Sequence, residues 1–410
     1  MPINNGIMVN SEIGKLKAVI MHRPGSELER LTPEYLAEML FDDIPWLKKM
    51  TEEHDGFADA LRDRGAHVYY IKELLRDVLE TVEVKTQMIR ETLDLSGIEN
   101  PDRREAITDY LQGLTTDEFA DKLIVGLPKS DITDIEKHLS LVDYINEEFP
   151  YYINPLPNSY FTRDPGAAIG NGLSINTMKV NARKREALLL KYFYKYHPIF
   201  NAKPTPLWYN YNNKYSLEGG DILVLSREVL AIGCSERTSA QGIELLCRNL
   251  FEGIEELDHI LVILIPHIRA FMHLDTVFTM VDHDKFTIYP GVEEHVKVFK
   301  VTRDSKPYSL HVDAEDNLTQ AIKKSLKLPA IKLIKSGGGD EITAAREQWN
   351  DSTNTLAIAP GVVITYNRNE ASNEVLRKNG IEVVEIDGQE LVRGRGGPRC
   401  MTMPIVREEL

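Results

Sequence analysis

The chain has 410 residues, 42% of them apolar and 27% charged, and a formal net charge of −15. This composition is typical of a globular protein, and its acidic balance argues against nucleic acid or an anionic membrane as a partner, because both require a basic face. Its three cysteines cannot form a disulfide framework, residues 1–5 lack a signal-peptide layout, and no apolar run approaches the ~20 residues of a membrane span. We therefore expect a cytoplasmic protein with a small-molecule ligand.

Strand and helix patterns alternate along most of the chain, which predicts an α/β fold. Thr32 followed by Pro33 is typical of a helix start, and Asn379-Gly380 of a helix end. The predicted strands occupy residues 16–21, 67–71, 221–225, 260–264, 276–280, 286–289, 357–365 and 382–386. The predicted helices occupy residues 182–196, 239–250 and 370–378.

Residues 73–148 interrupt this alternation. The segment is acidic and almost free of strand patterns, and its apolar residues recur three and four apart, as at Ile107 and Leu111. Such spacing indicates a helical face. We therefore predict an inserted helical subdomain at 73–148 and a catalytic α/β domain formed by residues 1–72 and 149–410.

A weak internal repeat is also present. Four apolar runs end a few residues before Arg23, Arg163, Arg237 and Arg368. The recurrence predicts repeated units whose strand ends face one site, separated by insertions of unequal length.

Two acidic motifs allow a structural and a functional interpretation. Asp164 begins an Asp-Pro-Gly turn, and it also follows an apolar run, at the kind of strand end where sites are usually built. Glu218-Gly219-Gly220-Asp221 is either a hairpin turn or a place where the backbone approaches a ligand closely. The local sequence leaves both alternatives open.

His273 and Asp275 stand two residues apart. In an extended segment they would point to the same side, because side chains alternate along a strand. A histidine beside a carboxylate can act as a general acid/base or as half of a metal site, whereas a lone histidine is more often structural.

Cys400 lies in a short run of glycines and arginines near the C-terminus. A lone cysteine is most often a small buried apolar residue. A glycine run offers a flexible approach, however, and the cationic field of Arg393, Arg395 and Arg399 would favour the thiolate, which is the nucleophile.

Taken together, these groups supply a nucleophile, an acid/base and an excess of carboxylates. Two carboxylates hold a planar guanidinium well through paired hydrogen bonds. An amino-acid carboxylate would in turn require an arginine such as Arg183 or Arg237. This set of side chains predicts free arginine as the substrate.

The motifs, in their order, resemble the bacterial arginine deiminases of the guanidino-group-modifying superfamily, over nearly the whole chain. The motifs that carry the resemblance are residues 158–164, 218–221, 235–238, 273–275 and 394–404. The resemblance implies a five-bladed α/β propeller of ββαβ units with an inserted helical bundle. It further implies a homo-oligomer that hydrolyses L-arginine to L-citrulline and ammonia in arginine catabolism, without a cofactor or metal.

The resemblance also implies the roles of the catalytic residues. Cys400 would attack the guanidinium carbon and form an amidino-cysteine intermediate, while Asp164 and Asp275 hold the guanidinium nitrogens. His273 would protonate the departing ammonia and then activate water, and Glu218 would orient His273.

The substrate contacts follow from the same resemblance. Arg183 and Arg237 would bind the substrate carboxylate, Asn158 its amino group, and Phe161 its aliphatic stem. Arg395 is similar to the family's mobile arginine near the thiol.

Residues 40–46, with Asp42 and Asp43, would lie on a gating loop, and Arg399 adds little to the resemblance. Because carboxylates surround Cys400, we expect its thiol pKa to be raised in the empty site and lowered when a guanidinium binds.

Three rival functions remain at this stage. A metal-dependent hydrolase would use His273, Asp275, Glu218 and Cys400 as ligands, although soft thiolate and hard carboxylates seldom share a catalytic site. An arginine-binding module would leave Cys400 idle. An agmatine deiminase would not need Arg183 and Arg237, because agmatine has no carboxylate.

Overall fold

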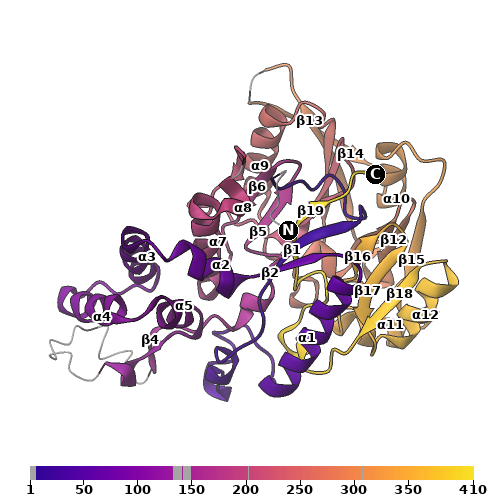
Figure 1. The fold of residues 1–410 in the computed structure, drawn as a ribbon. Helices are drawn as coiled ribbons and strands as arrows, with labels where there is room; N and C mark the ends of the chain where they lie inside the picture. Colours follow the sequence, from indigo (N-terminus) through magenta and orange to yellow (C-terminus); the bar gives the residue numbers. More distant parts are fainter. Residues whose placement is uncertain (1–5, 133–140, 142–148, 202, 307) are drawn as a thin grey trace.

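The computed structural model describes residues 6–132, 141, 149–201, 203–306 and 308–410, and the strands within those residues lie in six sheets (Figure 1). The described strands are β1 (Leu16–Met21), β2 (His67–Tyr70), β3 (Leu127–Pro128), β4 (Tyr151–Ile153), β5 (Gly166–Ile169), β6 (Gly172–Ile175), β7 (Leu207–Tyr209), β8 (Ile222–Val224), β9 (Val229–Cys234), β10 (His259–Leu264), β11 (Phe278–Asp282), β12 (Lys285–Ile288), β13 (Lys297–Arg303), β14 (Leu310–Glu315), β15 (Lys332–Lys335), β16 (Leu356–Ala359), β17 (Val362–Tyr366), β18 (Glu382–Ile386) and β19 (Met403–Arg407). The α-helices described here are α1 (Leu47–Asp63), α2 (Ile71–Val78), α3 (Val82–Leu95), α4 (Pro101–Gly113), α5 (Thr116–Val125), α7 (Lys184–Tyr196), α8 (Pro198–Asn201), α9 (Ala240–Gly253), α10 (Leu318–Ser325), α11 (Glu341–Trp349) and α12 (Glu370–Lys378).

Five of these sheets contain the same unit, an antiparallel pair followed by a strand parallel to its second member. β5 and β6 are antiparallel, for example, and β7 returns parallel to β6 after the helix α7. The same order holds in β8–β9–β10, β11–β12–β15 and β16–β17–β18. In the fifth unit, β19–β1–β2, the two ends of the chain pair with each other. The predicted α/β class is confirmed.

One predicted strand is in fact a hairpin. Residues 357–365 form parts of β16 and β17, and the chain reverses between them at Gly361, whose φ is +71°. The sequence carries a turn signal, Pro360-Gly361, between two apolar runs that are both largely buried. The predicted limits of β1, β18 and α12 agree with the structure.

The segment that carries His273 also differs from its prediction. Leu274–Thr276 form a 3₁₀ turn, and β11 begins only at Phe278. His273 and Asp275 therefore do not share one face of an extended strand. The turn directs them to different partners, described below.

Helices cover the sheets through apolar faces. In α9, the Oγ of Ser239 caps the first turn by accepting the N–H of Gly242 at 3.2 Å. Ile243, Leu246 and Cys247 then recur at helical spacing and are buried. Cys247 is thus a core residue, and burial raises the pKa of its thiol to about 12.

The helices α2–α5 occupy most of residues 71–125 and lie to one side of the five repeated sheet units in Figure 1. Their buried side chains share one hydrophobic cluster with β5, β6 and α7, so apolar packing is continuous from these helices to the sheets. Most of the remainder of the predicted insertion, 133–140 and 142–148, lies outside the described residues. None of the helices in the described part of the chain is long and apolar enough to cross a bilayer.

Candidate active site

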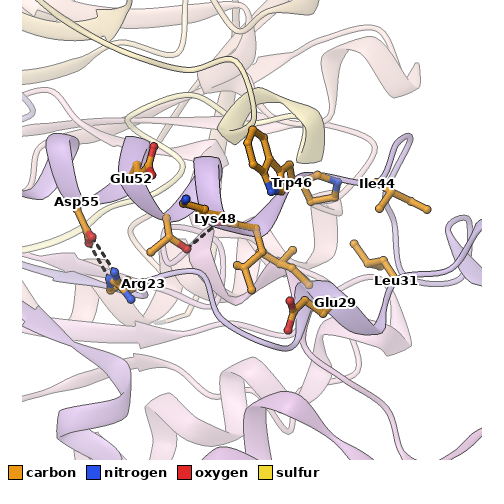
Figure 2. A pocket seen from close by; sticks show the side chains of 12 residues that line it. Arg23, Glu29, Leu31, Ile44, Trp46, Lys48, Glu52 and Asp55 are labelled. Atoms are coloured by element: carbon orange, nitrogen blue, oxygen red, sulfur yellow. Dashed lines mark hydrogen bonds and ion pairs between the residues drawn. The ribbon is translucent and has the colours of Figure 1, made fainter.

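Two cavities lie near the predicted gating loop. The larger, about 710 Å³, is lined by residues around Trp46 and the Arg23–Asp55 ion pair, and it contains none of the predicted catalytic side chains (Figure 2). The second, about 640 Å³, is lined by Leu40, Asp42, Lys179, Val180, Asn181, Glu236, Arg237, Arg269, Met272, Gly394 and Arg395. This second cavity therefore reaches two of the predicted substrate-binding arginines.

Cys400 is 4% exposed and is not among the residues that line that cavity. Its backbone N–H donates to Asn354 Oδ1 at 2.9 Å, and its Sγ is 3.8 Å from Asp275 Oδ2. The preceding glycines are required by close packing, because a Cβ at Gly396 would lie 2.3 Å from the Phe161 ring. The expectation that the glycine run gives a flexible approach is thus wrong; it allows the chain to pack tightly around the thiol.

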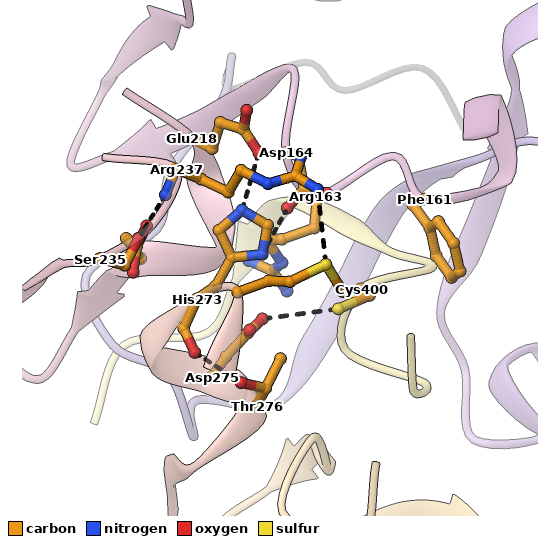
Figure 3. A network of polar contacts seen from close by, with 12 residues as sticks. Phe161, Arg163, Asp164, Glu218, Ser235, Arg237, His273, Asp275, Thr276 and Cys400 are labelled. Atoms are coloured by element: carbon orange, nitrogen blue, oxygen red, sulfur yellow. Dashed lines mark hydrogen bonds and ion pairs between the residues drawn. The ribbon is translucent and has the colours of Figure 1, made fainter. Parts of the chain in front are cut away.

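His273 is held between two carboxylates (Figure 3). Its Nε2 bonds Glu218 Oε2 at 2.7 Å, and its Nδ1 is 3.8 Å from Asp164 Oδ1. Gly220 lets the ring approach the backbone, because a Cβ there would lie 2.8 Å from the His273 ring. Of the two interpretations of the Glu-Gly-Gly-Asp motif, a hairpin turn or a close approach of the backbone, the structure shows the close approach, here to the His273 ring.

The electrostatics of this group favour a charged histidine. Burial alone would lower the pKa of His273, but Asp164 and the hydrogen bond to Glu218 outweigh burial and raise the pKa to about 9. Burial opposes ionisation of both carboxyls as well, yet His273 and neighbouring arginines hold the pKa of each below its usual value. At neutral pH the histidine is thus an imidazolium between two carboxylates.

Asp275 is oriented by Arg399. Its Oδ2 accepts Arg399 Nη1 at 2.7 Å, and its Oδ1 is buried without a hydrogen-bond partner among the described residues. Arg399 also donates to Glu12 Oε2 at 3.1 Å and to the carbonyl of Ile222 at 2.8 Å. This fully buried side chain fixes which oxygen of Asp275 remains free, a role that the sequence did not assign to Arg399.

Glu12, from the N-terminal segment, completes that ion pair. Burial would raise the pKa of Glu12, but Arg399 and Arg163 outweigh it and lower the pKa to about 2. Burial raises the pKa of Asp275, and Arg399 opposes the rise. The charge of Arg399 is therefore shared between two carboxylates, the ionised Glu12 and Asp275.

The thiol of Cys400 is protonated in this arrangement. Burial, then Asp275 and Asp164, raise its pKa well above the ordinary value, and Arg399 only partly opposes them. The cationic field expected from the neighbouring arginines is not what the thiol meets. Arg393 instead pairs with Asp43 and with Glu390, and Arg395 stacks on Trp349.

Arg183 and Arg237, the two predicted carboxylate-binding arginines, differ in availability. Arg183 is buried and donates Nη1 to Asp164 Oδ2 at 2.5 Å and Nη2 to Glu186 at 2.7 Å. Arg237 lines the cavity, with Nη1 3.8 Å from Glu218 Oε2. In this structure Arg237 is therefore the better placed of the two to meet a ligand, while Arg183 holds Asp164.

Asn158 and Phe161 are the other two residues that were predicted to contact the substrate. Asn158 donates Nδ2 to the carbonyl of Met39 at 2.7 Å, and Phe161 packs on Tyr160 with ring centroids 3.9 Å apart. In Figure 3 Phe161 lies apart from the His273 group, beyond Cys400.

Ion pairs tie this loop to the site. Asp42 pairs with Arg269 at 2.5 Å, and Asp43 pairs with Arg393. Leu40 has a φ of +61°, which is uncommon for a residue with a Cβ. Two ion pairs thus join the loop to Arg269, which lines the cavity, and to Arg393.

The predicted repeat of four arginines is only half right. Arg163 lies in the buried network and donates its backbone N–H to the carbonyl of Cys400 at 3.0 Å, and Arg237 lines the cavity. Arg23 instead pairs with Asp55 at the surface, and Arg368 is exposed.

One set of side chains could also hold a metal ion. Ligand atoms of Asp164, Glu218 and His273 all lie within 4.8 Å of one another. Two oxygens and an imidazole suit Zn²⁺ or a harder ion. Cys400 is not part of this group, so the ligand set predicted for a metal hydrolase is not the one that the described residues bring together.

Several residues of the site were not predicted. Glu12, Asn354 and Asp351 are buried polar residues beside the thiol or its neighbours. Residues 351–355 read as an ordinary polar loop in the sequence, yet all five are buried. A wholly buried polar loop has no compositional signature that separates it from an exposed one.

The site combines a buried thiol, carboxylates and an imidazolium, the groups that hydrolysis of a C–N bond in a cationic group requires. The sequence model of the arginine deiminase family matches residues 37–407. The chain belongs to this family.

Similarity to individual relatives extends over the whole chain. It is 48% identical to the arginine deiminase of Clostridium perfringens over 412 aligned positions, covering 99% of each chain. It is 45% identical to arginine deiminase 1 of Staphylococcus epidermidis, with complete coverage of both.

Solved structures share the fold at low sequence identity. The N-terminal domain of ArgZ, an arginine dihydrolase of cyanobacteria, matches with a TM-score of 0.55 and 13% identity, over 96% of this chain and 99% of that domain. A dimethylarginine dimethylaminohydrolase variant with an S-methyl-L-thiocitrulline adduct matches with a TM-score of 0.52 and 15% identity, over 95% and 99%. The chain thus shares its α/β fold with enzymes that modify guanidino groups.

Proposed function

We propose that the chain hydrolyses free L-arginine to L-citrulline and ammonia through an amidino-cysteine intermediate on Cys400. One observation carries this proposal. Asp164 Oδ1 and Asp275 Oδ1 are both buried without a hydrogen-bond partner in the described part of the chain, and Cys400 Sγ lies 3.8 Å from the second oxygen of Asp275. Two free carboxylate oxygens beside a thiol suit a guanidinium, whose nitrogens donate to both while its carbon faces sulfur.

Binding of the substrate would activate the nucleophile. A guanidinium between Asp164 and Asp275 neutralises the two carboxylates that raise the pKa of Cys400. The thiol then releases its proton to solvent, and the thiolate attacks the guanidinium carbon. We therefore expect the ultraviolet thiolate absorbance of Cys400 to appear at lower pH when an inert arginine analogue is bound.

His273 would move the remaining protons. As the C–S bond forms and a C–N bond breaks, the imidazolium gives its proton to the departing nitrogen, which leaves as ammonia. The neutral imidazole then takes a proton from water, and the resulting hydroxide attacks the amidino carbon. The C–S bond breaks as the new hydroxyl group passes its proton to the departing sulfur, which gives citrulline and restores the Cys400 thiol. Glu218, at 2.7 Å, keeps the ring oriented through both steps.

Different side chains would hold the carboxylate, the amino group and the aliphatic stem of the substrate. We assign Arg237 to the substrate carboxylate, Asn158 to its amino group and Phe161 to its aliphatic stem. Arg183 would reach the carboxylate only by leaving Asp164 and Glu186, and Arg395 would approach the thiol as the site fills. An enzyme that used Arg237 in this way would turn over arginine far better than agmatine, which has no carboxylate.

We further propose that the five repeated sheet units are the blades of a five-bladed propeller. Their common strand order and the pairing of β19 with β1 support this arrangement. Residues 73–148 would then be a helical insertion into a catalytic domain of residues 1–72 and 149–410. We also propose that the protein is a cytoplasmic homo-oligomer that has no nucleic-acid or membrane partner.

The test is citrulline and ammonia formation from arginine by the unmodified chain, Cys400→Ala and Cys234→Ala. Cys234 is a half-buried cysteine and serves as the matched control. We expect activity in the unmodified chain and Cys234→Ala and none in Cys400→Ala. Citrulline from Cys400→Ala would refute the mechanism.

The cluster of Asp164, Glu218 and His273 supports one competing function, a metal-dependent hydrolase. Chelators would abolish the activity of such an enzyme, and iodoacetamide would not. We expect the reverse, because the proposed nucleophile is the thiol.

A further inference from the structure

Asp221, the second acid of the Glu-Gly-Gly-Asp motif, has no part in the reaction proposed above. Its side chain is fully buried, and both of its carboxylate oxygens accept hydrogen bonds. Oδ1 accepts the backbone N–H of Leu274 at 2.8 Å, and Oδ2 accepts the hydroxyl of Ser235 at 2.6 Å. One buried carboxylate therefore joins two segments that are distant in the chain.

The first of these hydrogen bonds holds the segment that carries the predicted acid/base. Leu274 stands between His273 and Asp275 at the start of the 3₁₀ turn, and we call residues 273–276 the catalytic turn. Asp221 thus fixes the backbone at the point from which the two functional side chains diverge. Gly233 allows this approach, because a Cβ there would lie 2.3 Å from Asp221 Oδ1.

The second hydrogen bond leads to Arg237. The Oγ of Ser235 accepts the backbone N–H of Arg237 at 3.1 Å and that of Thr238 at 3.2 Å (Figure 3). These two bonds use both lone pairs of the hydroxyl oxygen, so its proton is left for Asp221. Thr238 Oγ1 in turn accepts the backbone N–H of Glu218 at 3.0 Å. The segment that presents Arg237 to the cavity is therefore held by the same carboxylate as the catalytic turn.

This pattern of donors requires Asp221 to be ionised, because each oxygen acts as an acceptor. Burial raises the pKa of the carboxyl to about 7, and His273 and the hydroxyl of Ser235 oppose that rise. An apolar residue at this position would avoid the cost of burying a charge. It could not, however, accept hydrogen bonds from both segments.

We propose that Asp221 is a positioning residue with two branches. Through the backbone N–H of Leu274 it holds the catalytic turn. Through Ser235 it holds Arg237, the side chain assigned to the substrate carboxylate. The role rests on the proposed arginine hydrolysis, and it makes one carboxylate responsible for aligning the reacting end of the site with the end that selects the substrate.

Steady-state kinetics with arginine at pH 8, where Asp221 is ionised, separate the two branches. Asp221→Ala removes both acceptors, whereas Ser235→Ala removes only the branch to Arg237. We expect Asp221→Ala to lower kcat roughly tenfold or more and to raise KM, because the catalytic turn and Arg237 both lose a hydrogen bond. Ser235→Ala should raise KM roughly fivefold and leave kcat within about twofold.

Inhibition by agmatine provides the matched ligand control, because agmatine has the guanidinium of arginine and no carboxylate. Its inhibition constant should change by less than about twofold in Ser235→Ala, since it offers Arg237 nothing to bind. The constant should rise in Asp221→Ala, because the catalytic turn carries Asp275. Equal weakening of arginine and agmatine in Ser235→Ala, or equal losses of kcat in the two variants, would overturn the proposal.

Glu347→Ala separates positioning from a general loss of stability. Glu347 is a buried carboxylate that accepts two backbone N–H groups and the hydroxyl of Ser372 at the start of α12. Its removal should lower the midpoint of denaturant unfolding and leave kcat and KM within about twofold. A loss of kcat in folded Glu347→Ala equal to that in Asp221→Ala would overturn the proposal.

Asp221→Asn decides the matter if Asp221→Ala does not fold. An amide accepts hydrogen bonds at only one of its two ends, so one branch is lost whichever way the side chain is oriented. We therefore expect a change in kcat or in KM, and a variant with both unchanged would overturn the proposal. Failure of the unmodified chain to form citrulline would refute the proposed function instead.

Discussion

Two of the buried histidines that bond a carboxylate in the described part of the chain, His273 and His259, differ in charge state. His273 bonds Glu218 at 2.7 Å, and His259 bonds Asp258 at 2.8 Å. The pKa of His273 is raised to about 9, whereas burial lowers the pKa of His259 in spite of Asp258. A short hydrogen bond to a carboxylate is therefore not sufficient to keep a buried histidine charged.

The surroundings of the carboxylate account for the difference. The Asp258 side chain is 64% exposed, so water screens its field, whereas Glu218 is fully buried and acts with Asp164 on the same ring. His259 also bonds Ser325 Oγ at 2.7 Å, which gives a Ser-His-Asp arrangement. Ser325 ends α10, where helix carbonyls disfavour an oxyanion, so the His259 group is structural.

The largest expected difference between the two sites is in kcat after each histidine is replaced. His273→Asn removes the proton donor and the base, and we expect kcat for citrulline formation to fall by roughly 10³-fold or more. His259→Asn should leave kcat within about twofold, because its ring has no part in proton transfer. Comparable losses of kcat in two folded variants would break the distinction.

The pH dependence of stability should have opposite signs at the two sites. The folded pKa of His273 is above its unfolded value of 6.5, so its stabilisation is complete below pH 6.5 and is lost as pH rises through about 9. The change amounts to about 3 kcal/mol at most, from 1.36 kcal/mol per unit. The folded pKa of His259 is below 6.5, so its contribution is present above that pH and falls as the solution becomes more acidic.

Denaturant unfolding from pH 5 to pH 10 measures both contributions. The free energy of unfolding of the unmodified chain, minus that of His273→Asn, should decrease from pH 6 to pH 10. The same difference for His259→Asn should decrease from pH 7 to pH 5. Equal slopes for the two variants would show that the two rings are in the same charge state.

The sequence was informative where function depends on residue type. Asp164, Glu218 and His273 stand in short motifs, and the structure brings these three together. The α/β class was also predictable, because strands and helices have different apolar periods. Both signals are local, and a single sequence is sufficient to detect them.

The rest of the site depends on pairs that are distant in the chain. Arg399 and Glu12 are 387 positions apart, and neither has a local pattern that predicts the other. Asp351 looks like part of an exposed polar loop until the fold buries it. The turn at Gly361 differs, because it has a local signal in Pro360-Gly361 that the apolar runs on both sides obscured.

The smallest expected effect follows the replacement of Asp258, the exposed carboxylate that bonds His259. Asp258→Asn removes one half of a pair whose acid is largely in water, and such pairs contribute about 1 kcal/mol or less. We expect the midpoint of denaturant unfolding to shift slightly and kcat to stay unchanged.

Glu218→Gln is the counterpart at the other histidine. It should lower the pKa of His273, measured by its ring proton shifts, because a buried negative charge is lost. If Asp258→Asn altered the pKa of His259 as strongly, exposure of the carboxylate would not be what separates the two sites.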